Sequence, residues 1–198
     1  MKRKILIAVL LGTSMLFVTG CFESETPDTT EPDTSQEQSQ NNYQGADFSI
    51  YVPEAWEKIE KKDFTSEIPA GTEIVFRNNV KNEDFTANVN ITKNTTLTNP
   101  ISSADYAKQA VSNLKASMFN FNEIKRETAK ILIGGTETET IYLAFEGKRN
   151  ENENQVQFLQ IYATKGQAGY IVTGAFSETE EELVVKKVDA MVRSFEVK

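Results

Sequence analysis

Apolar and polar residues alternate along several stretches of the first half of the chain, which is the pattern of half-buried β-strands. The first expected strand covers 48–52 and ends at Pro53, because proline cannot donate to a strand ladder. The next two expected strands cover 73–77 and 85–93. One face of the last strand is apolar, with Phe85, Ala87, Val89 and Ile91.

Two later stretches have the apolar spacing of helices, with intervals of four, three and four residues on a single stripe. The first stripe consists of Ala107, Val111, Leu114 and Met118, and the second of Val184, Val188, Met191 and Phe195. A serine followed three residues later by an acid is a capping box, which marks a helix start. Such pairs are Ser102 with Asp105 and Ser177 with Glu180. We therefore expect two helices, each with its apolar stripe packed on a sheet.

The segment between the two predicted helices has the pattern of a strand meander. The expected strands are 124–133, 136–148, 155–164 and 169–176. Gly134-Gly135 and Lys165-Gly166 indicate hairpin turns between them. Ile141, Leu143 and Phe145 share one face of the second strand. The predicted fold class is α+β, with a central antiparallel β-sheet and flanking α-helices.

The first residues of the chain follow a different pattern, typical of an export signal. Three basic residues, 2–4, precede fourteen uncharged ones, Ile5–Val18, whereas a membrane-spanning helix needs about 20. A basic start, a short apolar run and a small-residue cleavage zone form a secretory signal. The segment Val18-Thr19-Gly20-Cys21 resembles the lipobox of bacterial lipoproteins. This resemblance implies a signal peptide over 1–20, which is removed, and a lipidated Cys21 carrying fatty acid such as palmitate. The alternative is an uncleaved anchor helix with an incidental cysteine.

A polar, acidic segment separates this signal from the rest of the chain. Residues 22–42 contain six acids, no base and a single apolar residue, Phe22. Such a composition cannot bury enough surface to offset the entropy of ordering. We expect residues 21–42 to be the lipidated cysteine and a disordered acidic linker, followed by one domain over 43–198. An acidic activation segment is the alternative, but the interleaved apolar residues that it needs are missing.

The charge of the chain restricts its partners. The net charge is −8, and removal of the signal peptide takes away three of 21 basic residues and none of 29 acidic ones, which leaves −11. Nucleic acids and anionic lipid head groups repel such a surface. We therefore expect no nucleic-acid partner, and contact with the membrane only through lipid on Cys21.

The composition also restricts the chemistry. The chain has no histidine, and its one cysteine, Cys21, is assigned to the anchor. The usual ligands for zinc, copper and nickel are therefore missing, as is the ordinary proton shuttle near neutral pH. We predict no catalytic residue, no cofactor and no metal site. A hydrolase with a Ser–Lys nucleophile or a carboxylate pair needs no histidine and remains an alternative.

Several residues suggest function, but each has a simpler structural interpretation. Trp56 could stack a ligand, yet a lone tryptophan after a strand–proline turn more often closes the edge of a core. The acidic residues at the start of the last predicted helix are explained by their favourable interaction with the helix dipole, rather than by binding of a cation. The loop 151–154 lacks the glycine and the acidic spacing of a calcium loop. The acids are Glu178, Glu180, Glu181 and Glu182. The lysines Lys58, Lys61 and Lys62 lie among acids and indicate a solvated face. Asn90 and Asn94 match the glycosylation acceptor pattern, which we interpret as a coincidence in a bacterial chain, and Gly134-Gly135 has no phosphate-loop context.

The domain resembles the PsbP-like family over residues 46–197. The likeness rests on the opening Phe48-Ser49-Ile50-Tyr51-Val52-Pro53-Glu54-Ala55-Trp56, on the order strand, helix, meander and helix, and on the closing Met191-Val192-Arg193-Ser194-Phe195. Envelope lipoproteins of the DcrB type combine such a domain with a lipid anchor. The resemblance implies a binding or assembly role without catalysis. The metal-site histidines of plant members have no counterpart here, so it implies no metal site.

These patterns together predict a lipid-anchored protein on the extracytoplasmic face of a cell membrane. We expect it to be a non-catalytic binding or assembly module of the cell envelope, with an unidentified envelope protein as partner. A module that binds a small ligand is the principal alternative, and a hydrolase without histidine is a weaker one. A pocket larger than about 300 Å³ with converging polar groups would favour the ligand-binding alternative.

Overall fold

The computed structural model describes residues 41–64, 68–82 and 84–198. The signal peptide, Cys21 and nearly all of the linker lie outside the described residues. The described part belongs to the second of two compact units, 34–198. Among these residues, no helix is both long enough and apolar enough to cross a bilayer.

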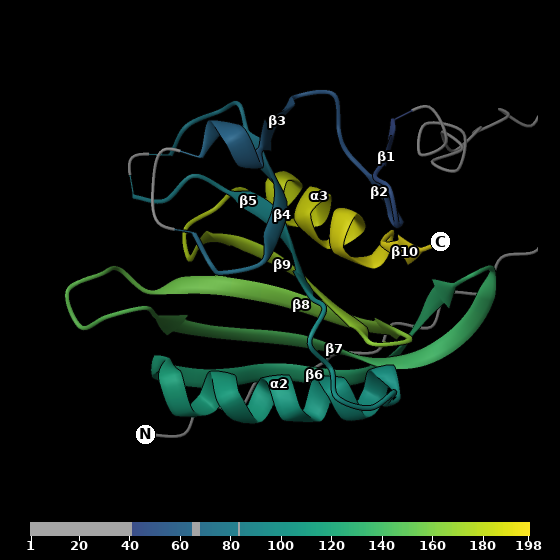
Figure 1. The fold of residues 1–198 in the computed structure, drawn as a ribbon. Helices are drawn as coiled ribbons and strands as arrows, with labels where there is room; N and C mark the ends of the chain where they lie inside the picture. Colours follow the sequence, from purple (N-terminus) through teal and green to yellow (C-terminus); the bar gives the residue numbers. More distant parts are fainter. Residues whose placement is uncertain (1–40, 65–67, 83) are drawn as a thin grey trace, which may run out of the picture. The chain divides into compact units, whose positions relative to one another are not determined.

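The described residues form one mixed sheet of ten strands and two α-helices (Figure 1). The strands are β1 (Asn42–Gln44), β2 (Phe48–Tyr51), β3 (Trp56–Glu60), β4 (Thr72–Asn78), β5 (Asn88–Asn94), β6 (Phe119–Ile133), β7 (Thr136–Lys148), β8 (Val156–Lys165), β9 (Ala168–Ser177) and β10 (Glu196–Val197). The helices are η1 (Lys61–Asp63, a 3₁₀ turn), α2 (Ser103–Ser117) and α3 (Glu182–Arg193). The predicted α+β class is confirmed, with the sheet as the dominant part.

The predicted antiparallel meander is the centre of the sheet. β6, β7, β8 and β9 pair in sequence order, all antiparallel. Gly134 and Gly135 turn the first hairpin with φ of 58° and 77°, values that glycine adopts without steric cost. The full strand order is β1-β2-β10-β6-β7-β8-β9-β5-β4-β3.

One strand pair corrects the prediction of an antiparallel sheet. β10 pairs antiparallel with β2 but parallel with β6, with Glu196 beside Leu132 and Val197 beside Ile133. The sheet is therefore mixed. The strand is only two residues long and follows α3, which carries the chain back across the sheet, so no alternation in the sequence could reveal its direction.

The two helices lie on opposite faces of the meander (Figure 1). Successive strand residues point to opposite faces, so a single strand serves both helices. On β7, Ile141, Leu143 and Phe145 pack in one cluster with α2, as the sequence predicted. Tyr142, between them, belongs to the larger core around α3. The predicted stripes are also confirmed: Val111 of α2 and Val188 and Met191 of α3 are among the buried residues.

Two glycines of β9 give the helices room to approach the sheet. A Cβ at Gly169 would lie 2.6 Å from Cζ of Tyr106 on α2. A Cβ at Gly174 would overlap Cγ1 of Val188 on α3. Because the two positions are five residues apart on a strand, they face opposite sides of the sheet. Each helix therefore packs where a strand lacks a side chain.

The first predicted capping box is confirmed and the second is wrong. Ser102 caps α2: its hydroxyl accepts a hydrogen bond from the Asp105 backbone N–H at 3.0 Å. Ser177 is instead the last residue of β9, where it pairs with Val156. The N-cap of α3 is Glu181, whose side chain makes no capping hydrogen bond. Strand pairing thus outweighs the local capping preference of Ser177.

The sheet curls so that its two ends meet around α3. Tyr43 of β1 contacts Phe76 of β4 edge-on, with ring centroids 5.4 Å apart. Lys93 of β5 forms an ion pair with Asp47, just before β2. The core enclosed in this way is the larger of two hydrophobic clusters and includes Phe48, Trp56 and residues of α3.

Candidate functional site

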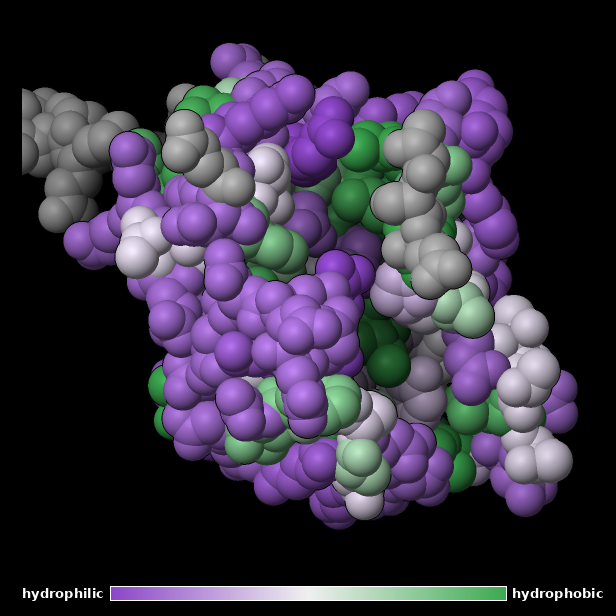
Figure 2. Space-filling view, turned by 90° about the vertical axis from the view of Figure 1, so that its left-hand side faces the viewer, coloured by the Kyte–Doolittle hydropathy of each residue, from purple (hydrophilic) through white to green (hydrophobic). Residues whose placement is uncertain are grey.

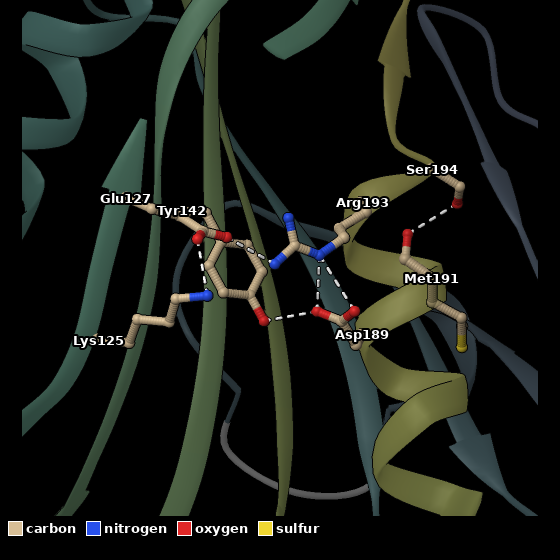
Figure 3. A network of polar contacts seen from close by, with 7 residues as sticks. All are labelled: Lys125, Glu127, Tyr142, Asp189, Met191, Arg193 and Ser194. Atoms are coloured by element: carbon tan, nitrogen blue, oxygen red, sulfur yellow. Dashed lines mark hydrogen bonds and ion pairs between the residues drawn. The ribbon is translucent and has the colours of Figure 1, made fainter. Parts of the chain in front are cut away.

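A polar network surrounds Arg193, at the end of α3 (Figure 3). Its guanidinium lies over the ring of Tyr142, 3.9 Å from the centroid. Its Nε donates to Asp189 Oδ1 at 2.9 Å, and its Nη2 donates to Glu127 Oε1 at 2.8 Å. The Tyr142 hydroxyl donates to the same Asp189 oxygen at 2.6 Å. Lys125 completes the network through a 2.7 Å ion pair with Glu127.

Three elements of secondary structure, α3, β6 and β7, place these side chains. Asp189 and Arg193 are four residues apart on α3, so they share one face of the helix. Glu127 and Tyr142 are directly paired in the β6–β7 register, so their side chains lie next to each other on the face covered by α3. The network therefore joins the last turn of α3 to two strands.

Ser194, which follows the last residue of α3, attaches the helix end to β2. The Ser194 hydroxyl donates to the Met191 carbonyl at 2.8 Å and accepts a hydrogen bond from the Tyr51 backbone N–H at 2.9 Å. This hydroxyl links the helix end to β2. The C-terminal end of α3 is thus held to β2, β6 and β7 by directed polar contacts.

The surroundings of three groups in the network shift their pKa values away from neutral pH. Burial, followed by the hydrogen bond to Asp189, raises the pKa of Tyr142. Lys125 and then Arg193 lower the pKa of Glu127. Burial works against the charge of Arg193, but its bonds to Glu127 and Asp189 outweigh burial and raise its pKa. Near neutral pH, Tyr142 therefore stays neutral and Glu127 and Arg193 stay charged. These three groups are suited to bracing α3 rather than to exchanging protons.

Buried hydroxyl groups form a second cluster, between α2 and β8. The Ser103 hydroxyl accepts from the Thr164 backbone N–H at 3.0 Å, and the Thr164 hydroxyl donates to the Ile101 carbonyl at 2.7 Å. Thr140 donates to the Tyr162 carbonyl at 2.6 Å. Each of these hydroxyl groups satisfies a backbone N–H or C=O group. This pattern is that of a structural cluster and not of an activated nucleophile.

The described residues form two small hollows. One, of about 120 Å³, lies where the ends of the sheet meet, and its lining includes Tyr43, Asp47 and Lys93. The other, of about 140 Å³, lies beside the end of α3, and its lining includes Lys130 and Phe195. Pockets for small ligands are typically 300–1,000 Å³. Both hollows are below that range, which disfavours the ligand-binding alternative.

The structure places Trp56 as the sequence predicted. The indole is only 7% exposed and belongs to the large core, at the start of the edge strand β3. The backbone N–H of Trp56 donates to the Pro53 carbonyl at 3.1 Å, which closes the turn between β2 and β3. Trp56 is therefore a core residue.

The acids before α3 do not converge on one point. Glu182 forms an ion pair with Lys186 in the first turn, and Glu181 is the N-cap. Glu180 is half-buried, and its Oε2 has no hydrogen-bond partner among the described residues. Within the described ranges, no group of three or more acidic, histidine or cysteine side chains could hold a metal ion.

The other candidate residues are also accounted for locally. Lys58 and Lys62 both pair with Glu60, and all three are exposed. In the β7–β8 loop, Glu153 accepts hydrogen bonds from Arg149 at 2.9 and 3.0 Å. Asn90 lies within β5, and Asn94 ends that strand. None of these residues joins the Arg193 network.

Much of the surface is polar. Figure 2 shows one face, which is mostly hydrophilic, with hydrophobic residues visible in a hollow. Four large hydrophobic side chains are exposed among the described residues: Val80, Phe119, Ile124 and Leu183. Two of them, Phe119 and Ile124, lie on β6.

The sequence alone did not reveal the Arg193 network. The spacing of Asp189 and Arg193 is a helical ion-pair pattern, and it was the one local signal available. The contribution of Glu127 and Tyr142 depends on the β6–β7 register and on the side of the sheet that α3 covers. These are long-range features without a local pattern.

Comparison with known proteins supports the fold. The sequence matches no family model and no curated protein. The cyanobacterial PsbP (CyanoP) of Synechocystis sp. PCC 6803 matches with a TM-score of 0.52 and 17% identity, over 79% of this chain and 91% of that one. LpqN of Mycobacterium tuberculosis, described as involved in cell envelope biogenesis, matches with a TM-score of 0.50 and 11% identity, over 76% and 83%. The domain therefore has the PsbP-like fold that its opening and closing motifs predicted.

Proposed function

We propose that this chain is a non-catalytic binding module of the cell envelope, held on the extracytoplasmic face of a membrane by lipid on Cys21. The acidic linker would act as a spacer, with an r.m.s. span of roughly 25 Å for a flexible chain of its length. A lipid anchor confines the domain to a surface and raises its effective concentration toward partners on that surface. The partner is an envelope protein.

The observation that carries this proposal is the use of the polar side chains within the domain. The network of Arg193, Asp189 and Tyr142 braces α3, and the hydroxyl cluster of Ser103 and Thr164 ties α2 to β8. Both clusters satisfy the fold. Arg193 and Ser194 line the hollow of about 140 Å³ beside α3, but both side chains are already engaged in hydrogen bonds that hold the helix end. A scaffold of this kind is suited to presenting a surface.

Two further observations support the proposal. The hollows of about 120 and 140 Å³ are small for a metabolite, which favours a protein partner over a small ligand. A structural neighbour, LpqN, is described as involved in cell envelope biogenesis. Fold likeness alone does not assign function, so the anchor provides the direct test.

Cys21→Ser should abolish incorporation of labelled fatty acid and leave the precursor uncut, because the serine hydroxyl cannot replace the lipid-accepting thiol. The variant should also fail to complement a deletion strain, since the module is no longer held near its partner. Wild type and Ser35→Ala, a linker change that leaves the lipobox intact, serve as controls. Continued labelling of the Cys21→Ser variant would refute the anchor.

A further inference from the structure

Strand β6 has one fully paired edge and one open edge. Its inner edge pairs with β7 over nearly its whole length. Among the described residues, its outer edge pairs only with β10, and only at Leu132 and Ile133. The stretch Lys125–Lys130 lies before β10, in regular register with β7. We call this stretch the open edge.

An open edge offers a row of unpaired backbone N–H and C=O groups to another extended chain. Natural proteins usually keep such edges short or block them with proline, bulges or a covering loop. The open edge contains no proline, and the register shifts of β6 occur before it, up to Lys125. Ile124, next to the edge, is 53% exposed. The hydrogen-bonding geometry therefore specifies an extended peptide segment as the occupant.

The two faces of the open edge differ in chemistry. Glu127 and Ala129 point toward the core around α3. Arg126, Thr128 and Lys130 are exposed on the other face. Two cations thus lie four residues apart on one exposed face. A pairing segment would match them with two acids at the same spacing, because directly opposite charges stabilise strand pairs.

Arg126 and Lys130 can exchange their present acidic partners for the acids of a bound segment. Arg126 forms an ion pair with Glu123 at 2.8 Å, and Lys130 forms one with Glu137 at 2.6 Å. The Lys130–Glu137 pair is largely exposed, and the Arg126–Glu123 pair is about one-third exposed. Ion pairs of this kind contribute little stability, so replacing one carboxylate by another costs little.

The open edge leads into the hollow beside α3. This hollow, about 140 Å³, is lined by Lys130, Ile131 and Phe195 among others. It lies where β10 ends the open edge. A strand laid along the open edge would therefore place its end at a hollow with the volume of a small side chain.

A second copy of this chain fits the open edge poorly. In an antiparallel pair related by a two-fold axis, directly opposite residues point to the same face of the sheet. Each possible register is therefore centred on one residue, which lies opposite its own copy. Centring on Lys125, Arg126 or Glu127 places that charge against its own copy. Centring on Thr128 places Arg126 against Lys130, and centring on Lys130 places it against its own copy. Centring on Ala129 opposes no like charges, but it leaves only residues 127–131 to pair, because β10 already pairs with Leu132 and Ile133. Like charges directly opposite destabilise strand pairing. The charges thus favour a different protein.

We propose that the open edge of β6 binds an extended segment of an envelope protein by strand addition, with two acids four residues apart facing Arg126 and Lys130. This inference rests on the proposed function and names its surface and the chemistry of its partner. Backbone hydrogen bonds would give affinity, and the acids and the end residue at the hollow would give specificity.

The test uses a synthetic peptide whose core is Val-Glu-Val-Thr-Val-Glu-Val, flanked by glycine and serine, titrated into the lipid-free protein under NMR observation. Binding should shift the amide signals of 124–131, and a peptide with both glutamates replaced by lysine should bind at least about fivefold more weakly. Arg126→Glu combined with Lys130→Glu should reverse this preference. Lys186→Glu, an exposed change on α3, should leave it unaltered.

Strand addition also predicts a dependence on alternate amides of the peptide. N-methylation of the amides that face β6 should abolish binding, and N-methylation of the alternate set should be tolerated. This control needs no change in the protein, so misfolding cannot produce it. Binding that tolerates both sets, or no shift along 124–131, would overturn the proposal.

A crosslinking experiment in cells separates this inference from the proposed function. A photoreactive residue at Thr128 should capture a partner that one at Lys186 does not, and the captured segment should contain the paired acids. If Lys186 captures a partner and Thr128 does not, the binding function stands and the open edge fails. Crosslinks from Thr128 only to a second copy of this chain would also overturn the proposal.

Discussion

Arg193 holds the end of α3 through its shape as well as its charge. The flat guanidinium stacks on Tyr142 and bonds two carboxylates at the same time, and only arginine can do both. Arg193→Lys should therefore lower the free energy of unfolding by about 1–2 kcal/mol, although the charge is kept. Arg149→Lys, at an exposed ion pair in the β7–β8 loop, should change it by less than about 0.5 kcal/mol. Urea denaturation measures the free energy of unfolding of both variants. Equal losses for Arg193→Lys and Arg149→Lys would contradict the bracing role of Arg193.

Glu127 should make stability depend on pH. Its neighbours Lys125 and Arg193 lower its pKa below the ordinary value of 4.5. A carboxylate with a depressed pKa stabilises the folded state above its unfolded pKa, and this stabilisation is lost as pH falls through the folded pKa. Glu127→Gln should therefore destabilise the protein at pH 7 and have a smaller effect at about pH 3, because the stabilisation shrinks as pH falls below 4.5 and through the lower pKa of the folded protein. An equal penalty at both pH values would mean that ionisation of Glu127 contributes nothing.

At the scale of residues, the sequence predicts burial well and long-range polar contacts poorly. Trp56, Val111 and Leu143 are buried as their patterns predicted, because burial follows local periodicity. The contact of Arg193 with Glu127 joins residues 66 positions apart. Such a contact depends on strand register and helix placement, which no local pattern of residues contains.

The elements fit together where β9 has no side chain. Gly174 lies beneath Val188 and Val192 of α3, and any Cβ there requires the helix to move. Gly174→Ala should therefore lower the free energy of unfolding by about 1–3 kcal/mol through overpacking. Gly135→Asn is the matched control, because that turn has open space around it and asparagine tolerates a positive φ. A fully stable Gly174→Ala protein would show that α3 is less closely packed than described.

At the scale of elements, strong periodicity predicted the meander and both helices, whereas short strands were missed. β1 and β10 contain only three and two residues, which is too few for a reliable alternation. β3 was missed because its apolar residues, Trp56 and Ile59, lie three positions apart and do not alternate. A serine followed three residues later by an acid occurs at Ser177 as it does at Ser102. It caps a helix only at Ser102, because Ser177 is still paired within β9. The two serines differ because Ser177 pairs with Val156 of the neighbouring strand β8.

In the domain as a whole, the two polar clusters described above hold the helices to the sheet, and the outer surface takes no part in these contacts. α2 and α3 cover opposite faces of the meander, and the two ends of the sheet close around α3 (Figure 1). The interior polar groups are used to hold these layers together. What the fold leaves unused is its outer surface, including the open edge of β6. This arrangement supports the binding role that we propose.

The central claim is that this surface binds and that no single residue catalyses a reaction. The most direct measurement is an alanine scan of the serine, lysine, tyrosine, aspartate and glutamate residues of 43–198, scored by complementation of a deletion strain, with protein levels and folding checked. For binding spread over a surface, most substitutions should weaken complementation in small steps, and strong losses should coincide with loss of partner capture. A single substitution that abolishes complementation while folding and partner capture stay intact would contradict the account and reveal a catalytic residue.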